Sequence, residues 1–156
     1  MTTAAKKNET KPQPAIAMLK ADHKLVDELF EQFESAKSSE TKKTLAEQIC
    51  KELTIHAQVE EEIFYPAVKE ALKDKQLVPE AQVEHATLKN LIAEIEAAKD
   101  DEEMWEARVK VLGEYVKHHV KEEQNEMFPK AKASDLDMDE LGVMMQERKN
   151  ELMSEA

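Results

Sequence analysis

The sequence predicts an all-α protein: an up-down-up-down four-helix bundle of two pseudo-symmetric helical hairpins, with a short fifth C-terminal helix. Three observations support this prediction. The 156 residues include only two glycines and five prolines, a composition that favours helices. Apolar residues recur at spacings of three and four along four long segments. Finally, histidines occupy corresponding positions in the two halves of the chain.

The first hairpin begins after a polar, proline-containing stretch that we expect to be a flexible N-terminal tail (residues 1–14). Its first helix starts at Ala15, carries His23 on its apolar stripe and is interrupted by SAKSSET. Its second helix starts near Glu40 and carries His56. Pro66 is expected to kink or end this helix, because proline lacks an N–H donor and clashes with the preceding turn.

The second hairpin follows the connection KDKQLVPE, with Pro79 in the first turn of the third helix and His85 on its apolar face. The Asp100–Asp101 pair offers N-cap chemistry for the fourth helix, which carries His119 and which Pro129 is expected to end. We therefore expect the bundle over residues 15–133. A Met-rich fifth helix, packed on the bundle, is expected within residues 134–156.

Charge and cysteine content exclude several classes of function. The formal net charge of −12 opposes binding to nucleic acid or to anionic membranes. The single cysteine, Cys50, rules out an intramolecular disulfide and suits a reducing compartment. No apolar run has the length of a membrane span, and the N-terminus lacks the apolar core of a secretory signal. We expect a soluble cytoplasmic protein.

The two halves carry the same motif. HAQVEEEIFYP and HVKEEQNEMFP both run from a histidine to a proline ten residues later. His56 and His119 are 63 residues apart, and the histidines of DHKLVDELFEQF and EHATLKNLIAEI are 62 apart. In each copy a glutamate follows the second histidine by four residues, at Glu60 and Glu123. His118 is the one histidine outside the repeat, and we expect it on the surface.

This pattern indicates a metal site. Residues i and i+4 share a helix face, so each His–Glu pair can point into the bundle. Buried carboxylates are costly unless something such as a cation compensates them. Imidazole suits Fe, Zn and Cu, and carboxylates can bridge two cations. We predict a dinuclear site with open coordination positions, and its candidate ligands are His23, His56, Glu60, His85, His119 and Glu123.

A simpler interpretation exists for each half alone. Of the 156 residues, 34 are acidic, so one His–Glu pair at i+4 is more often a surface ion pair, and a lone histidine on an apolar stripe is more often a core residue. The runs Glu60–Glu62 and Glu122–Glu123 also leave the choice of glutamate open locally. Matched histidines on all four stripes favour the metal site.

At these residues the sequence resembles the hemerythrin-like family, the HHE cation-binding domains. The resemblance rests on DHK, HAQVEEEIFYP, EH and HVKEEQNEMFP, and covers roughly residues 15–130. It implies a non-haem di-iron centre, oxo- and carboxylate-bridged, that binds dioxygen or nitric oxide, or senses oxygen or iron. We expect dioxygen, nitric oxide or peroxide as the small-molecule ligand, and a monomer or a weak homodimer. By resemblance, one iron would be held by His23 and His56 and the other by His85 and His119, with Glu60 and Glu123 as bridges.

The sequence departs from the respiratory oxygen carriers of the family, which have a further histidine where this chain has Lys89. The counterpart of Lys89 in the first repeat is Asp27. Reversible oxygen carriage of the respiratory type is therefore not expected. Lys89 either reaches solvent, which we favour, or steadies a bound anion. Glu52 and Tyr115 lie one turn before His56 and His119. Both are candidates to orient a ligand. The alternative for Glu52 is a solvated residue on the helix surface, and the alternative for Tyr115 is an aromatic residue of the core.

Several functions remain open at this point. The centre could bind or sense a diatomic ligand, or it could catalyse peroxide breakdown, ferroxidase chemistry or nitric oxide reduction. Iron handling and a structural module with adventitious zinc are further alternatives. No general acid or base stands apart from the ligand set in the sequence, which favours binding over catalysis.

Overall fold

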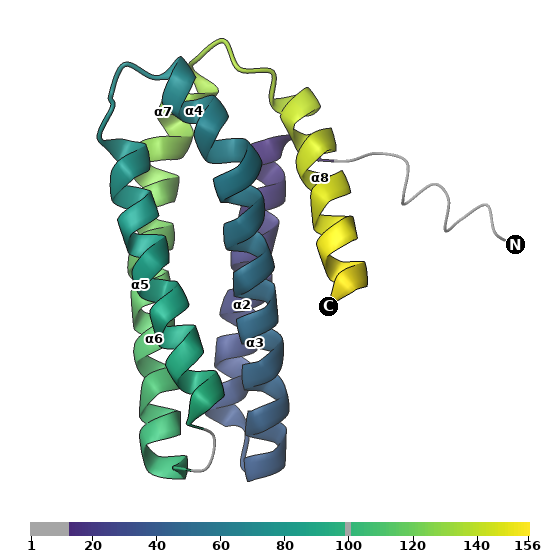
Figure 1. Cartoon of the computed structure of the whole chain (residues 1–156), viewed down its shortest axis with the longest axis vertical. Coiled ribbons are helices and arrows are strands. Elements are labelled where there is room, and N and C mark those ends of the chain that lie inside the picture. The colour runs from purple at the N-terminus through teal and green to yellow at the C-terminus, as the bar shows by residue number, and fades with distance from the viewer. Residues whose placement is uncertain (1–12, 99–100) are drawn as a thin grey trace, which may run out of the picture.

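The computed structural model describes residues 13–98 and 101–156, and within these ranges the only regular secondary structure is helical. Four helices of 21 residues each stand side by side (Figure 1). They are α2 (Ala15–Ser35), α3 (Ser39–Val59), α5 (Leu77–Ala97) and α6 (Glu102–Glu122). The all-α bundle predicted from the sequence is confirmed.

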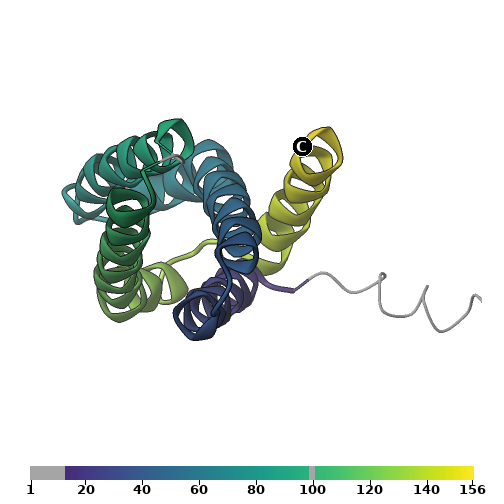
Figure 2. The ribbon, with the colours of Figure 1, turned by 90° about the horizontal axis from the view of Figure 1, so that it is seen from below.

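The four helices form a closed ring in which successive helices run in opposite directions. α2 packs on α3, α3 on α5, α5 on α6, and α6 returns to α2. The view along the bundle shows this ring, with the last helix, α8 (Met138–Glu155), lying outside it against α2 and α3 (Figure 2). Because the ring is closed, side chains on all four inner faces can meet on the bundle axis.

Polar side chains start three of the helices. Ser38 accepts a hydrogen bond from a backbone N–H in the first turn of α3, at 3.1 Å. Asp101 and Asp137 do the same for α6 and α8, at 3.4 and 3.1 Å. These bonds satisfy amides that have no partner within the helix. Of the predicted Asp100–Asp101 pair, Asp101 is the cap, and residue 100 lies outside the described ranges.

Both long helices that carry a His–Glu pair continue past their proline. Each passes through a five-residue π-helical turn, η1 (Glu60–Phe64) or η2 (Glu123–Met127). An α-helical segment then follows, α4 (Tyr65–Ala71) or α7 (Phe128–Lys132). The expectation that Pro129 ends its helix is therefore wrong. Both prolines stand in the first turn of the new segment, where a missing N–H costs little.

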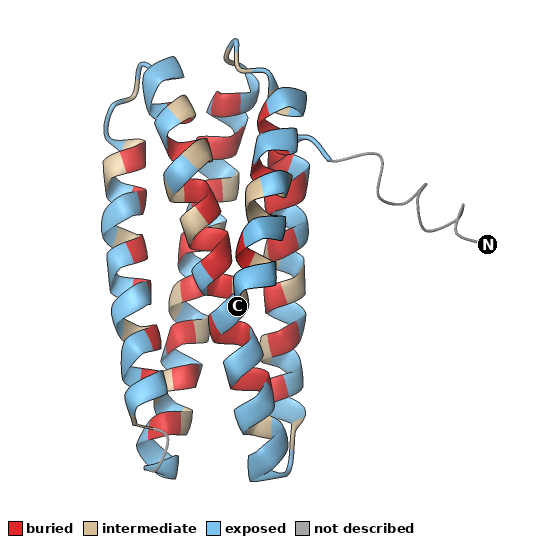
Figure 3. Cartoon of the chain, turned by 45° about the vertical axis from the view of Figure 1, so that its right-hand side comes forward, coloured by how far each residue is buried: buried red, intermediate tan, exposed pale blue. Residues whose placement is uncertain are grey.

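The apolar core is divided into two clusters along the bundle axis. One lies at the end that carries α4 and α7 and includes Phe64, Phe128 and Met145. The other lies toward the opposite end and includes Ile49 and Leu112. Buried residues follow the inner faces of the helices, and the outer faces are exposed (Figure 3). Among the described residues, no helix is both long and apolar enough to cross a membrane.

α8 approaches the start of α2 closely. Its Leu141, Met145 and Leu152 are buried in the first apolar cluster. Gly142 makes the approach possible, because a Cβ atom there would lie 2.0 Å from the backbone oxygen of Gln13. The contact between α8 and its own bundle therefore depends on a residue without a side chain.

Candidate metal centre

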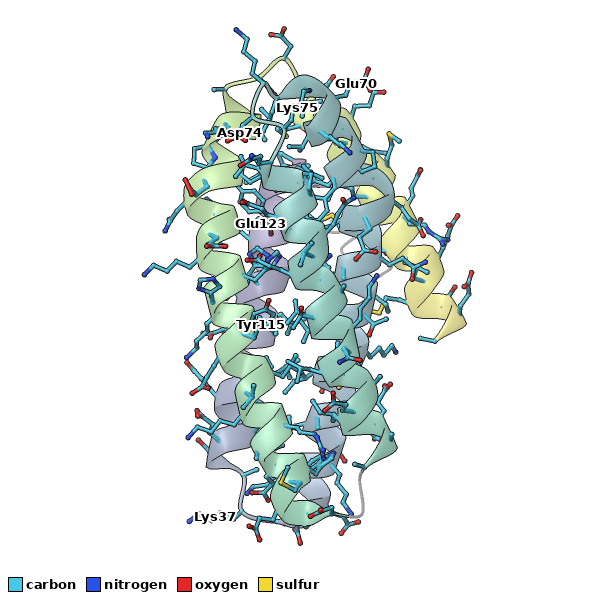
Figure 4. The ribbon with its side chains drawn as sticks, turned by 60° about the vertical axis from the view of Figure 1, so that its left-hand side comes forward. Lys37, Glu70, Asp74, Lys75, Tyr115 and Glu123 are labelled. Carbon is cyan, nitrogen blue, oxygen red and sulfur yellow. The ribbon has the colours of Figure 1, made fainter. Side chains whose placement is uncertain are left out.

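The six residues singled out by the repeat meet in one layer between the two apolar clusters. None of their side chains is more than 9% exposed. Their ligand atoms form two overlapping groups, within each of which all atoms lie within 4.8 Å of one another. One group is His23, His56, Glu60 and Glu123, and the other is Glu60, His85 and His119. Figure 4 labels Glu123 at the level of this layer, above Tyr115.

The Glu60 carboxylate lies between imidazoles of the two hairpins. Its Oε1 atom is 3.3 Å from His56 Nε2 and 3.2 Å from His85 Nε2. Glu123 has the equivalent position, with 3.3 Å from Oε1 to His23 Nε2 and 3.7 Å from Oε2 to His119 Nε2. Each carboxylate therefore reaches both hairpins, as a bridge between two cations requires.

The imidazoles form two pairs. The His23 and His56 ring centroids are 5.0 Å apart, and those of His85 and His119 are 4.9 Å apart. The pairs coincide with the division that the family resemblance implies, one pair for each metal ion.

The residue before the first histidine of each hairpin holds the second histidine of the same hairpin. Asp22 Oδ2 lies 3.0 Å from His56 Nδ1. Glu84, 62 residues later, forms a short hydrogen bond with His119 Nδ1. Each carboxylate favours a proton on Nδ1, which leaves Nε2, the nitrogen that faces the centre, free to bind a metal.

A second set of outer contacts crosses between the hairpins. Glu61 Oε2 lies 2.8 Å from His85 Nδ1. Gln124, 63 residues later, places its side-chain amide 2.9 Å from His23 Nδ1. All four imidazoles are thus held from behind by a polar side chain, and the partner of His23 is the one that carries no charge.

Tyr65 is the functional residue that sequence reasoning missed. Its fully buried hydroxyl group donates to Glu60 Oε1 at 3.2 Å and forms a short hydrogen bond to Glu123 Oε2. The same oxygen lies 3.2 Å from His85 Nε2 and 3.5 Å from His119 Nε2. Burial, and then the two carboxylates, raise the pKa of Tyr65 well above its ordinary value, so the phenol is neutral.

The π-helical turn explains why Tyr65 faces the centre. Tyr65 follows Glu60 by five residues, and a π turn brings residues at i and i+5 onto one face. A regular α-helix would direct Phe64 there instead. The equivalent position in the second hairpin is Phe128, whose ring stacks on His23 with centroids 6.0 Å apart and planes 3° from parallel. The pseudo-symmetry is broken at this position, as it is at Glu61 and Gln124.

The carboxylates and imidazoles of the layer compensate one another's charge. Burial acts to raise the pKa of Glu60, but His56 and His85 outweigh it and hold that pKa well below its ordinary value. Burial acts to lower the pKa of His56, but Glu60 and Asp22 hold it well above its ordinary value. The pKa of His85 is raised too, because Glu60 and Glu61 outweigh its burial.

Several buried polar atoms of the layer have no hydrogen-bond partner. Whether these atoms suit a metal ion decides whether a metal fits the site. Among the described residues, His23 Nε2, His56 Nε2, Glu60 Oε2 and Glu123 Oε1 are buried and accept or donate no hydrogen bond. Such atoms are costly to bury without a partner. Imidazole nitrogen and carboxylate oxygen are donors that a divalent transition metal accepts. The residues present therefore fit a bound cation.

The other predicted residues lie outside this layer. Lys89 is half exposed, and its ammonium group pairs with Glu61 at 2.6 Å, so it neutralises the partner of His85. Among the described contacts, neither Glu52 nor Tyr115 bonds to any of the six residues, and both are half-buried. His118 is exposed as predicted, with Nε2 3.4 Å from Glu122.

Cavities adjoin the imidazoles on several sides. A small internal one, of about 20 Å³, is lined by the four histidines together with apolar side chains that include Val26, Leu53, Leu88 and Val116. These four residues lie one turn from the histidines, on the side opposite to Glu60 and Glu123. A larger cleft of about 250 Å³ between α2 and α6 reaches His23 from the surface.

Known proteins share the fold. A solved structure of a hemerythrin HHE cation-binding domain-containing protein from Mycobacterium kansasii matches with a TM-score of 0.79. The match covers 92% of this chain and 89% of that chain at 24% sequence identity, which shows likeness of fold.

A DNA nickase of Nostoc sp. (strain PCC 7120) is 29% identical over 128 residues. These cover 82% of this chain and 35% of the nickase, so the chain spans about a third of that protein's length. The family model of the hemerythrin HHE cation-binding domain matches residues 15–131. The chain is therefore a metal-binding protein that belongs to the hemerythrin HHE cation-binding domain family.

Proposed function

We propose that the centre holds two iron ions and binds a small diatomic ligand, dioxygen or nitric oxide. His23 and His56 would hold one ion, His85 and His119 the other, and Glu60 and Glu123 would bridge them. The imidazole pairs and the two-sided contacts of each carboxylate support this division. A bound iron pair would supply redox activity and open coordination positions.

The cavity next to the imidazoles is the observation that supports a small diatomic ligand. Its volume of about 20 Å³ is close to what one water-sized molecule needs. Its walls beyond the histidines are mainly valine and leucine side chains, which cannot hydrogen-bond to a polar or charged ligand. Asp22 also lines it, with its oxygens paired to His56 and Lys149. A small, uncharged molecule suits such a space, and the cleft that reaches His23 offers it a path from solvent.

A redox enzyme is the second candidate, and Tyr65 favours it. The neutral phenol is a proton donor within hydrogen-bond distance of ligand atoms of both metal groups. Breakdown of peroxide requires a proton to be moved between its oxygen atoms, and reduction of nitric oxide consumes protons, so a buried donor would serve either reaction. Tyr65 also holds the two carboxylates in place, which a binding protein would need equally.

DNA cleavage is not part of this proposal, although the Nostoc relative carries that description. This chain corresponds to 35% of the nickase. Its net charge of −12 would repel a phosphate backbone.

Anaerobic reconstitution tests the metal content. Apoprotein supplied with Fe(II) should retain about two iron atoms per chain and become coloured in air. His85→Ala and His119→Ala should each abolish the centre, whereas His118→Ala, a neighbouring but exposed histidine, should leave it intact. Retention of a single iron, or of zinc alone, would contradict the dinuclear proposal.

Stopped-flow mixing separates the two candidate functions. The reduced protein is mixed in turn with dioxygen, nitric oxide and peroxide. A stable adduct with dioxygen or nitric oxide supports the binding protein. Multiple turnovers of peroxide or nitric oxide support the enzyme, and no reaction with any of the three would contradict both.

A further inference from the structure

Two ion pairs from neighbouring residues attach α8 to the bundle, in addition to its apolar face. Lys149 Nζ lies 2.7 Å from Asp22 Oδ1 on α2. Arg148 Nε lies 2.8 Å from Glu62 Oε1 in the π-helical turn η1. Both pairs join α8 to the first hairpin, against whose outer side it lies (Figure 2).

The two ion pairs differ in what lies behind the carboxylate. The second oxygen of Asp22, Oδ2, is 3.0 Å from Nδ1 of the candidate ligand His56. Glu62 instead accepts a hydrogen bond from Gln58, and among the described contacts it reaches none of the six candidate ligands. Of the two cations, Lys149 is therefore the one that a carboxylate links to the metal layer.

The Lys149–Asp22 pair is also the more buried of the two. Its side chains are 19% and 10% exposed, whereas those of Arg148 and Glu62 are 29% and 40% exposed. An ion pair that is shielded from water holds its partners more firmly than one at the surface. The contact behind His56 is thus the firmer of the two ionic attachments of α8.

The second hairpin has no equivalent of this lysine. Glu84 corresponds to Asp22 and forms the short hydrogen bond with His119 Nδ1. Among the described contacts, however, no lysine or arginine pairs with Glu84. The repeated motif therefore does not account for Lys149, which α8 supplies to one half of the centre alone.

Loss of Lys149 would leave one oxygen of a buried carboxylate without its partner. Asp22 is 8% exposed, and an unpaired charged oxygen in such a place is costly. Asp22 would gain by turning toward water and away from His56, whose ring orientation a partner of this kind fixes. The charge of Lys149 opposes a nearby metal ion, but Asp22 lies between the two and carries the opposite charge.

We propose that Lys149 is a positioning residue for the metal centre, so that docking of α8 and metal binding at His56 strengthen each other. The inference rests on the proposed metal centre and adds a means of regulating it. Coupling between two binding events is reciprocal. Displacement of α8 therefore weakens the hold on the ion at His23 and His56, and a bound ion holds α8 more firmly.

The metal affinity of the full-length apoprotein tests the role of Lys149. Co(II) is titrated anaerobically in competition with a chelator of known affinity, and the absorption bands of bound Co(II) are recorded. Lys149→Met should bind one of the two ions about tenfold more weakly and with shifted bands, because His56 is no longer oriented. Lys149→Arg keeps a cation that can reach Asp22, so its affinity should lie within about threefold of wild type.

Arg148→Met is the matched control, since it removes the neighbouring ion pair of the same helix and leaves Asp22 paired. Its Co(II) affinity should stay within about twofold of wild type, with unchanged bands. Equal affinities of Lys149→Met and Arg148→Met, or tighter binding by Lys149→Met, would overturn the positioning role and leave the metal centre intact. If wild type itself fails to retain two ions per chain, the dinuclear centre is contradicted, and the coupling with it.

Amide hydrogen exchange tests the reciprocal effect. On loading of wild type with Co(II), the amides of α8 should exchange about tenfold more slowly, because the bound ion fixes His56 and with it Asp22. In Lys149→Met the same loading should change their exchange by less than about twofold. Equal exchange of α8 in the metal-free and the loaded wild type would contradict the coupling.

Discussion

The Tyr65 hydroxyl group links parts of the centre that are distant in sequence. It contacts Glu60 five residues away and Glu123 58 residues away. Each carboxylate is also adjacent to imidazoles of both hairpins. One phenol therefore contacts both carboxylates, and in the metal-free protein it partly satisfies their buried oxygens.

Tyr65→Phe keeps the ring in place and removes only this hydroxyl group. Because the two buried carboxylates lose the one donor that they share, we expect the free energy of unfolding of the apoprotein to fall by about 1–3 kcal/mol. Urea denaturation measures the change. Tyr115→Phe is the matched control, since Tyr115 is half-buried and makes no described hydrogen bond to the six candidate ligands; its effect should stay within about 0.5 kcal/mol. Equal effects of the two substitutions would show that the Tyr65 bonds do not stabilise the fold.

The repeat was sufficient to predict the six buried residues, because the ten-residue spacing from histidine to proline selects His119 over His118 and Glu60 from its acidic run. Tyr65 could not be predicted in this way, since a period of 3.6 residues places Phe64 on the inner face. Asp22 and Glu84 were visible as an acid before each first-helix histidine. Their role depends on a neighbouring helix, however, which no local pattern in the sequence reveals.

At the scale of elements, the two π-helical turns distinguish this bundle from one built of regular α-helices. Each inserts one extra residue into the turn that begins at Glu60 or Glu123, and so changes which later side chain points inward. Each also places the following proline in a first turn, so the helix continues. The four helices were predictable from apolar periodicity, but these turns were not, because their sequences EEEIF and EQNEM carry no distinctive helix-breaking residue.

α8 connects the periphery to the metal centre. Lys149 Nζ lies 2.7 Å from Asp22 Oδ1, while the other Asp22 oxygen holds His56. The lysine and His56 together outweigh the burial of Asp22 and lower its pKa. The Met-rich sequence predicted a fifth helix. Whether it would dock on its own bundle could not be known without the close approach at Gly142.

Gly142→Ala should weaken the docking of α8. The added Cβ atom would collide with the backbone at Gln13, and backbone cannot rotate away as a side chain can. We expect the free energy of unfolding to fall by about 1–3 kcal/mol, with faster amide hydrogen exchange in α8.

Gly113→Ala is the matched glycine control. Its Cβ atom would lie 3.1 Å from the Phe30 ring, which can shift, and alanine favours helix, so stability should stay within about 1 kcal/mol of wild type. A Gly142→Ala protein as stable as Gly113→Ala would contradict the close approach of α8.

At the scale of the whole molecule, a charged layer interrupts the hydrophobic core, so global stability depends on proton or metal occupancy of that layer. In the apoprotein, burial opposes the charge on His56 and His85, but Glu60 raises the pKa of both above the ordinary 6.5. Their stabilising contribution is complete below pH 6.5 and is lost as pH rises through the raised values. The lowered pKa of Glu60 gives a contribution that is present above 4.5 and lost at more acidic pH.

The apoprotein should therefore unfold at a higher temperature near pH 5.5 than near pH 8.5. Metal ions replace these protons, so the metal-loaded protein should lose little stability over the same interval. Scanning calorimetry of both forms measures this. His118→Ala, with an exposed ring, should retain the wild-type profile, and an apoprotein more stable near pH 8.5 would contradict the assignment.

Neither hairpin contains a complete metal site. The group around His23 and His56 takes Glu123 from the second hairpin, and the group around His85 and His119 takes Glu60 from the first. A single hairpin could assemble the same centre only by pairing with a second copy of itself about a two-fold axis. The chain therefore has the geometry of a homodimer whose two subunits have been fused. The two halves are not identical, since the first has Tyr65 and is covered by α8, while the second has Phe128 and an exposed acidic face.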